Sequence, residues 1–191
     1  IGSLEKALKA IESGRFKDEI AAVTVKSRKG DTVIDTDEQP GNAQVEKIRK
    51  LNPAFKKDGT ITAANSSSIS DGGSALVLMR ESEAQKRGLK PMARIVAHST
   101  HAQLPAEFSI APIGAISKVL ARAGWSKDDV DLYEINEAFA VVSMLAISEL
   151  GLDASKVNVN GGACALGHPI GSSGSRILVT LLYALKNQGK K

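Results

Sequence analysis

Two stretches of the sequence decide the fold: "DLYEINEAFAVVSMLAISELG" at residues 131–151 and "KVNVNGGACALGHPIGSSGSRILVTLLYALK" at residues 156–186. Each opens with a short run that is typical of a strand and goes on to a longer apolar segment that is typical of a helix. Strands are therefore predicted at 131–136 and 156–160, and helices at 137–151 and 175–186.

This alternation of strand and helix has short connections, so it predicts an α/β fold with a parallel sheet and right-handed crossovers. Both predicted helices are apolar almost all the way round. Each is therefore expected to be buried on more than one side, as in a layer of helices packed between two sheets.

The rest of the chain is predicted to add shorter elements to this core. Leu4, Leu8 and Ile11 form a helical stripe that Gly14 can end. A Lys-Gly-Asp turn at residues 29–31 separates two short runs of strand character. The other predicted elements are strands at 19–25, 32–35, 74–79 and 92–102, and helices at 43–51, 82–89 and 113–124.

Composition excludes several classes of protein. Of the 191 residues, 42% are hydrophobic and 24% are charged, which is typical of a globular chain. The net charge is only +4 and no basic stripe is present, so no nucleic-acid partner is predicted. No apolar run approaches the roughly 18 residues that span a bilayer, so no membrane partner is predicted either. The single cysteine excludes an internal disulfide and favours a reducing compartment, which leads us to expect a cytoplasmic location.

The glycine-rich loop at residues 158–176 carries the candidate chemistry. A nucleotide phosphate loop would need Lys and Ser or Thr after the second glycine, where the chain has His168 and Pro169. A simple tight turn explains the glycines, but it does not explain a histidine between glycine and proline. Open α/β folds place their chemistry at the carboxyl ends of parallel strands, so His168 is predicted to be functional.

Other candidate residues have structural interpretations. Cys164 stands between two alanines, and a lone small thiol there is typical of packing. Asn136 follows a predicted strand and precedes a predicted helix, where asparagine is a good N-cap. His98 and His101 would point to opposite faces of a strand, so no metal site is predicted.

Three segments together resemble the thiolase family. They are "NEAFA" at residues 136–140, "GHPIGSSG" at 167–174, and "DGTITAANSSSISDGGSALVLM" at 58–79. The resemblance covers nearly the whole chain, and the first two motifs are highly specific. It implies part of a layered αβαβα fold: residues 1–69 from a loop domain that contacts coenzyme A, 70–90 from a returning strand and helix, and 91–191 from an incomplete C-terminal domain.

The resemblance also implies an activity. Thiolases condense two molecules of acetyl-CoA to acetoacetyl-CoA and CoA in a Claisen reaction, or run the reverse thiolysis, through an acyl-cysteine. They use no cofactor beyond their coenzyme A thioester substrates, they belong to fatty acid metabolism, and they are about twice this length. By the same resemblance, one reactive cysteine is expected in the N-terminal half, before Ile1, and the other near the C-terminus, beyond Lys191. Two alternatives stay open: a degradative 3-ketoacyl-CoA thiolase of longer chains, and an isolated coenzyme A-binding fragment without turnover.

Site residues follow from the same resemblance. His168 is expected to activate the nucleophilic cysteine and to contact a thioester oxygen, while Asn136 holds a water at that oxygen. The expected partners are the remainder of the thiolase polypeptide and further copies, in a homodimer or homotetramer. The residues expected to line the channel for coenzyme A are Ala64, Ser67, Phe108, Ala138 and Phe139.

Overall fold

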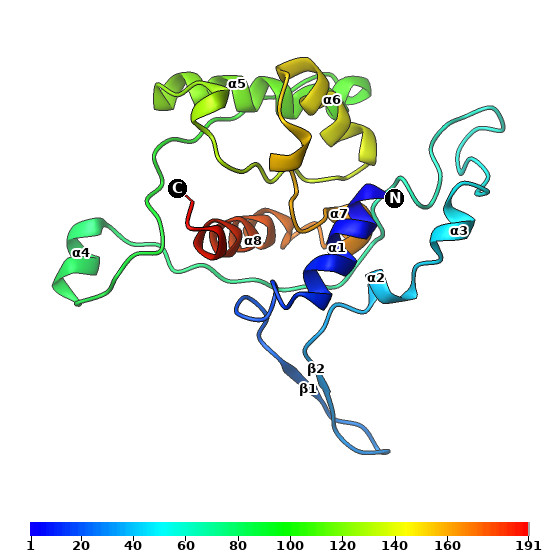
Figure 1. Cartoon of the computed structure of the whole chain (residues 1–191), viewed down its shortest axis with the longest axis horizontal. Helices are drawn as coiled ribbons and strands as arrows, with labels where there is room; N and C mark the ends of the chain where they lie inside the picture. The colour runs from blue at the N-terminus through cyan, green and yellow to red at the C-terminus, as the bar shows by residue number, and fades with distance from the viewer. Residues whose placement is uncertain (191) are drawn as a thin grey trace.

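The structure is a computed structural model, and it describes residues 1–190. Three helices organise its C-terminal part (Figure 1): α5 (Ala111–Ala123) and α6 (Ala140–Leu150) lie together, and α8 (Ser173–Gln188) lies below them. α6 and the segments on either side of it form the main core. The buried residues of this core are Ile135, Val142, Ala146, Leu152 and Val157.

All three helices were predicted, and each ends where a glycine follows. Gly124, Gly151 and Gly189 have φ angles of 70°, 58° and 62°, in the left-handed region that ends a helix and favours glycine. α6 begins three residues later than predicted, at Ala140, because Phe139 is extended and forms an isolated antiparallel bridge with Ser66.

The predicted strands on either side of α6 run parallel to one another, but they pair at one position only. The N–H of Tyr133 donates to the carbonyl of Lys156 at 2.9 Å, and the N–H of Asn158 donates to the carbonyl of Tyr133 at 2.9 Å. These bonds make an isolated parallel bridge between Tyr133 and Val157. The predicted direction is therefore confirmed, whereas the predicted extent, 131–136 and 156–160, is wrong.

Residues 74–79 and 92–102 are neither helical nor paired in the structure, so the strands predicted there are not formed. A strand is stable only when its backbone groups bond to a neighbour, and within residues 1–190 no segment pairs with either one. Their apolar side chains stay exposed, Val77 at 85% and Ile95 at 65%. The sequence pattern is that of buried strands, and the described residues do not cover them.

The N-terminal helix α1 (Gly2–Glu12) packs against the short helix α7 (Ala163–Leu166), beside α8 in Figure 1. The predicted stripe is partly wrong, because Leu8 is exposed. The buried cluster keeps Leu4 of the predicted stripe and adds Ala7 of α1 and Ala165 of α7.

A hairpin projects away from these helices (Figure 1). Its strands β1 (Val23–Val25) and β2 (Thr32–Ile34) are antiparallel, with Thr24 opposite Val33. The predicted strands and turn are confirmed, although both strands are shorter than expected and are exposed on both faces.

The remaining helices are short. The helix predicted over 43–51 is confined to α3 (Val45–Ile48), of which only Ile48 packs against the α1 cluster. No helix of the described residues is long and apolar enough to cross a membrane. The other short elements are α2 (Gln39–Asn42), α4 (Glu81–Lys86), and the 3₁₀-helices η1 (Pro105–Ile110), η2 (Lys127–Asp129) and η3 (Ala154–Lys156).

Candidate functional site

His168 lies directly after α7, in the loop predicted to carry the chemistry. Gly161 and Gly167 flank α7 with φ angles of 88° and 86°, which a residue with a side chain rarely adopts. The backbone N–H of His168 donates to the carbonyl of Ser68 at 3.2 Å. This bond to Ser68 therefore fixes the backbone of the loop at His168 itself.

The imidazole of His168 lies between two polar side chains. Its Nδ1 atom is 2.5 Å from the hydroxyl oxygen of Ser173, and its Nε2 atom is 3.4 Å from Nδ2 of Asn136. The side chain of His168 is half-buried. Asn136 and His168 are separated by 32 residues in the chain, and the fold brings them together.

Asn136 does not cap α6, so the N-cap interpretation is wrong. The residue before α6 is Phe139, and no side chain caps this helix by a hydrogen bond. Oδ1 of Asn136 is instead buried without a hydrogen-bond partner among the described residues. An amide oxygen in this position is suited to accept a hydrogen bond from a water or a ligand.

The residues expected to line the channel for coenzyme A lie on adjoining segments. Ser67 donates both its N–H and its hydroxyl to the carbonyl of Ala138, at 3.1 and 2.9 Å. The rings of Phe108 and Phe139 are tilted against one another, with centroids 5.9 Å apart. Ala64 is half-buried three residues before Ser67. The structure thus brings Ser67 to Ala138 and Phe108 to Phe139, next to the segment that carries Asn136.

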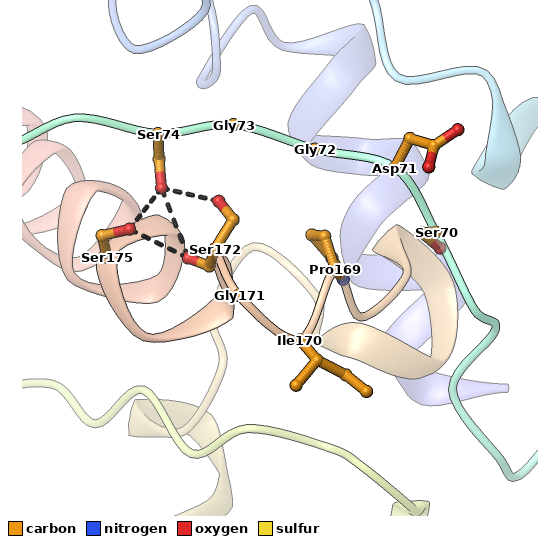
Figure 2. Close-up of a pocket in the computed structure, with 10 residues that line it drawn as sticks. All are labelled: Ser70, Asp71, Gly72, Gly73, Ser74, Pro169, Ile170, Gly171, Ser172 and Ser175. Carbon is orange, nitrogen blue, oxygen red and sulfur yellow. Dashed lines mark hydrogen bonds between the residues drawn. The ribbon is translucent and has the colours of Figure 1, made fainter.

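A hollow of about 370 Å³ lies between residues 70–74 and residues 169–175 (Figure 2). The hydroxyl oxygen of Ser74 lies 2.8 Å from that of Ser172 and 2.5 Å from that of Ser175, which closes one end. Pro169 contacts the backbone at Gly72 so closely that a Cβ there would overlap the proline ring. These contacts hold residues 169–175, which follow His168, against residues 70–74.

The sequence matches the thiolase N-terminal domain over residues 1–82 and the thiolase C-terminal domain over residues 89–191. The chain belongs to the thiolase family. Acetyl-CoA acetyltransferase of Syntrophomonas wolfei is 51% identical over 187 residues, which are 97% of this chain and 47% of that protein. The chain spans about half the length of the curated relatives it matches.

Solved thiolase structures have the same fold. The crystal structure of the Bacillus anthracis acetyl-CoA acetyltransferase matches with a TM-score of 0.95 and 48% identity, over 99% of this chain and 48% of that one. Human mitochondrial 3-ketoacyl-CoA thiolase matches with a TM-score of 0.90 and 42% identity, over 99% and 48%. The prediction of a thiolase-like α/β fold, represented in part, is therefore confirmed.

Cys164, the only cysteine of this thiolase chain, has a thiol whose surroundings favour its protonated form. Its thiol lies 3.8 Å from the carbonyl oxygen of Glu137, to which it donates. Burial first, and then the nearby Glu137 carboxylate, raise the pKa of the Cys164 thiol to about 12. A thiol that keeps its proton is a poor nucleophile, so the packing interpretation of Cys164 fits the structure.

Two carboxyl groups with raised pKa values lie beside α8. Burial raises the pKa of Glu134 to about 8 and that of Glu19 to about 7, and in both cases the positive charge of Arg176 acts in the opposite direction. Glu19 accepts a hydrogen bond from the hydroxyl of Thr180 at 3.0 Å. In the described part of the chain, no group of three or more His, Cys, Asp and Glu side chains is arranged to hold a metal ion.

Two residues of this site were missed by sequence reasoning. Ser173 had only a general signal, a serine-rich start of a helix, and it contacts the His168 ring. Glu137 was expected in the first turn of α6, but it is buried at 7% exposure and lies before that helix. The sequence offers only one sign that Glu137 belongs to the site, its position next to Asn136 in the "NEAFA" motif.

Proposed function

We propose that this chain forms part of an acetyl-CoA C-acetyltransferase, which condenses two molecules of acetyl-CoA to acetoacetyl-CoA and CoA or catalyses the reverse thiolysis. One observation carries the proposal: the His168 imidazole and the Asn136 amide, 3.4 Å apart, converge from the two motifs of a thiolase fold. Relatives named acetyl-CoA acetyltransferase at about half identity support it.

His168 acts first as a general base. Its Nε2 takes the proton of a cysteine thiol, and the thiolate attacks the thioester carbonyl of the first acetyl-CoA. The C–S bond to coenzyme A breaks, and the leaving CoA thiolate takes the proton of a second cysteine, which becomes a thiolate. His168 keeps the first proton on Nε2, and an acetyl-cysteine remains. Cys164 has a raised pKa and donates to a backbone carbonyl. The nucleophile is therefore a cysteine that this sequence does not contain.

The second half-reaction forms the carbon–carbon bond. A second cysteine, also outside this sequence, takes a proton from the α-carbon of the next acetyl-CoA. The resulting carbanion attacks the acetyl-cysteine, whose C–S bond breaks to release the enzyme thiolate and acetoacetyl-CoA. Negative charge develops on the thioester oxygen of the incoming acetyl-CoA. The Nε2–H of His168, which carries the proton taken from the first thiol, and a water held by Oδ1 of Asn136 stabilise that charge.

Ser67, Ala138 and Phe139 form one side of the channel for the pantetheine arm of coenzyme A, with Ala64 and Phe108 beside them. The Ser67 hydroxyl is already bonded to Ala138, so Ser67 contributes shape rather than a free donor. Phe108 is 47% exposed and supplies an apolar contact next to Phe139. No cofactor is needed, because coenzyme A enters as a thioester substrate.

For the whole protein we propose a homodimer or homotetramer, a cytoplasmic location and a role in fatty acid metabolism. Exposed apolar residues support the assembly: Val77, Leu78 and Ile95 are 85%, 70% and 65% exposed, and exposed apolar surface is typical of contacts with further polypeptide. The remainder of a thiolase polypeptide and further copies of the chain would cover such surface.

The test is turnover of acetyl-CoA by the whole protein, in which this chain is present together with the part that carries the two cysteines. This chain by itself is expected to be inactive. We expect acetoacetyl-CoA to form, and mass spectrometry to detect a cysteine carrying one acetyl group. Faster cleavage of longer 3-ketoacyl-CoA esters than of acetoacetyl-CoA would favour a degradative thiolase. Saturable binding of coenzyme A without product or acetyl-cysteine would refute the enzymatic proposal and leave a coenzyme A-binding fragment.

A further inference from the structure

The carboxylate of Glu137 joins three separate parts of the chain. Its Oε2 atom accepts from the Ser3 hydroxyl at 2.8 Å and from the N–H of Cys164, at the start of α7, at 3.2 Å. Its Oε1 atom accepts from Nδ2 of Asn158 at 3.3 Å. All three partners are donors, which suits an acceptor-only carboxylate, and the side chain is 7% exposed.

Asn158 extends this connection to the segment that carries Asn136. It accepts from the N–H of Ile135 at 2.8 Å and donates to the carbonyl of Ile135 at 2.9 Å, so its amide replaces a strand partner. Asn158 is 3% exposed and has a positive φ of 46°, uncommon for a residue other than glycine. Such strain persists only where the surrounding contacts require it.

The backbone of the glycine loop is shaped around the same carboxylate. A Cβ added to Gly162 would overlap the carboxyl group of Glu137. The N–H of Gly162 donates to the hydroxyl oxygen of Ser3 at 2.8 Å, so Ser3 completes the seat of the carboxylate. Glu137 thus lies against the start of α7, and His168 follows the end of α7.

We propose that Glu137 is a positioning residue, whose carboxylate sets the distance and orientation between Asn136 and His168. Asn136 is adjacent to Glu137 in the chain, and His168 is joined to it through α7, where the carboxylate accepts from the N–H of Cys164. The backbone positions of both Asn136 and His168 therefore depend on the same buried carboxylate. This inference rests on the proposed function for its catalytic consequence only.

The sharpest variant is Glu137→Gln, which keeps shape and volume. An amide has one acceptor oxygen, so if that oxygen faces Ser3 and Cys164, its NH₂ group meets the donor Nδ2 of Asn158. At least the hydrogen bond from Asn158 is then lost, and the new NH₂ group faces the NH₂ group of Asn158. The matched control is Glu149→Gln on α6, which removes the same charge from an exposed position.

The first readout does not need activity. We expect ¹⁵N chemical shifts of the His168 ring to change in Glu137→Gln and to stay as in the unmodified protein in Glu149→Gln. In an active protein, kcat of Glu137→Gln should fall by about 10- to 100-fold with KM nearly constant, since small misplacements of catalytic groups have large effects on rate. Absence of turnover in the unmodified whole protein, with the part that carries the reactive cysteines present, contradicts the proposed function. Unchanged His168 shifts and kcat in a folded Glu137→Gln overturn this inference.

A second variant keeps the test decisive if Glu137→Gln does not fold, as judged by circular dichroism. Ser3→Ala removes a single donor to the carboxylate and leaves the carboxylate in place. We expect smaller changes of the same His168 ring shifts, in the same direction. A folded Ser3→Ala protein with His168 shifts identical to those of the unmodified protein would also overturn the positioning role.

Discussion

The Nδ1 atom of His168 lies 2.5 Å from the hydroxyl oxygen of Ser173, and that hydroxyl also lies 3.0 Å from the carbonyl of Pro169. A hydroxyl has one proton, and a carbonyl can only accept. Ser173 therefore donates to Pro169 and accepts from the Nδ1–H of His168. This arrangement leaves a lone pair on Nε2, the nitrogen that faces Asn136, and a lone pair is what a general base needs.

We predict that Ser173→Ala weakens this preference for the Nδ1–H form. ¹⁵N spectra of the ring should show a larger share of the form protonated at Nε2, because Nδ1 loses its acceptor. Turnover of an active protein should fall about tenfold, which corresponds to about 1.4 kcal/mol, the value of one hydrogen bond. The control is Ser117→Ala, an exposed serine on α5. Equal ring spectra in Ser173→Ala and the unmodified protein would contradict the assignment.

Replacing His168 itself should have a larger effect. We expect His168→Ala to lower kcat for both thiolysis and condensation by about 10²–10⁴-fold, because it removes the base and a donor to the thioester oxygen. His98→Ala is the matched control, since the His98 side chain is exposed. Within residues 1–190 its carbonyl accepts from Arg122, and its ring makes no hydrogen bond. Initial rates with acetoacetyl-CoA and CoA measure the difference, and near-normal turnover of His168→Ala would remove it from the mechanism.

The helices could be predicted because their signal is local. α5, α6 and α8 are long apolar segments, and glycines 124, 151 and 189 mark their ends. The strands could not be placed as well, because a strand depends on a partner that its own sequence does not specify. Residues 74–79 have the composition of a buried strand and remain unpaired within the described chain.

In the site, too, the features that depend on neighbouring residues could be predicted, whereas contacts between distant residues could not. The position of His168 between glycine and proline indicates function from the sequence alone. Its contact with Asn136, 32 residues away, depends on the fold, and only the family resemblance suggested it. Glu137 could not be predicted as a buried acceptor, since its partners Ser3 and Asn158 are 134 and 21 residues away in the chain.

The single cysteine offers a test of the local environment. The pKa of Cys164 is raised to about 12 by burial and by the Glu137 carboxylate. Only the thiolate reacts with iodoacetamide, so labelling near neutral pH should be about two to three orders of magnitude slower in the folded chain than in urea. Mass spectrometry after timed quenching measures the rates. Rapid stoichiometric labelling of the folded chain would restore Cys164 as a candidate nucleophile.

The last prediction concerns the carboxyl groups of Glu134 and Glu19, whose folded-state pKa values are raised to about 8 and about 7. Their ordinary value is 4.5, so between about pH 4.5 and 8 the folded chain binds more protons than the unfolded chain. The free energy of unfolding must therefore decrease as pH rises through this window. The stabilisation is complete below the unfolded pKa and is lost once both groups ionise in the folded state.

The variant Glu134→Gln separates this effect from other titrations, because glutamine resembles the protonated acid at every pH. Urea unfolding at about pH 5 and about pH 8 should show a loss of stability with rising pH that is smaller in Glu134→Gln than in the unmodified protein, by about 1–3 kcal/mol. Arg176 keeps the difference from being larger, since its charge favours the ionised form of Glu134. Glu149→Gln, exposed on α6, should keep the unmodified slope. A pH dependence unaltered by Glu134→Gln would mean that Glu134 titrates in the folded chain as it does in the unfolded one.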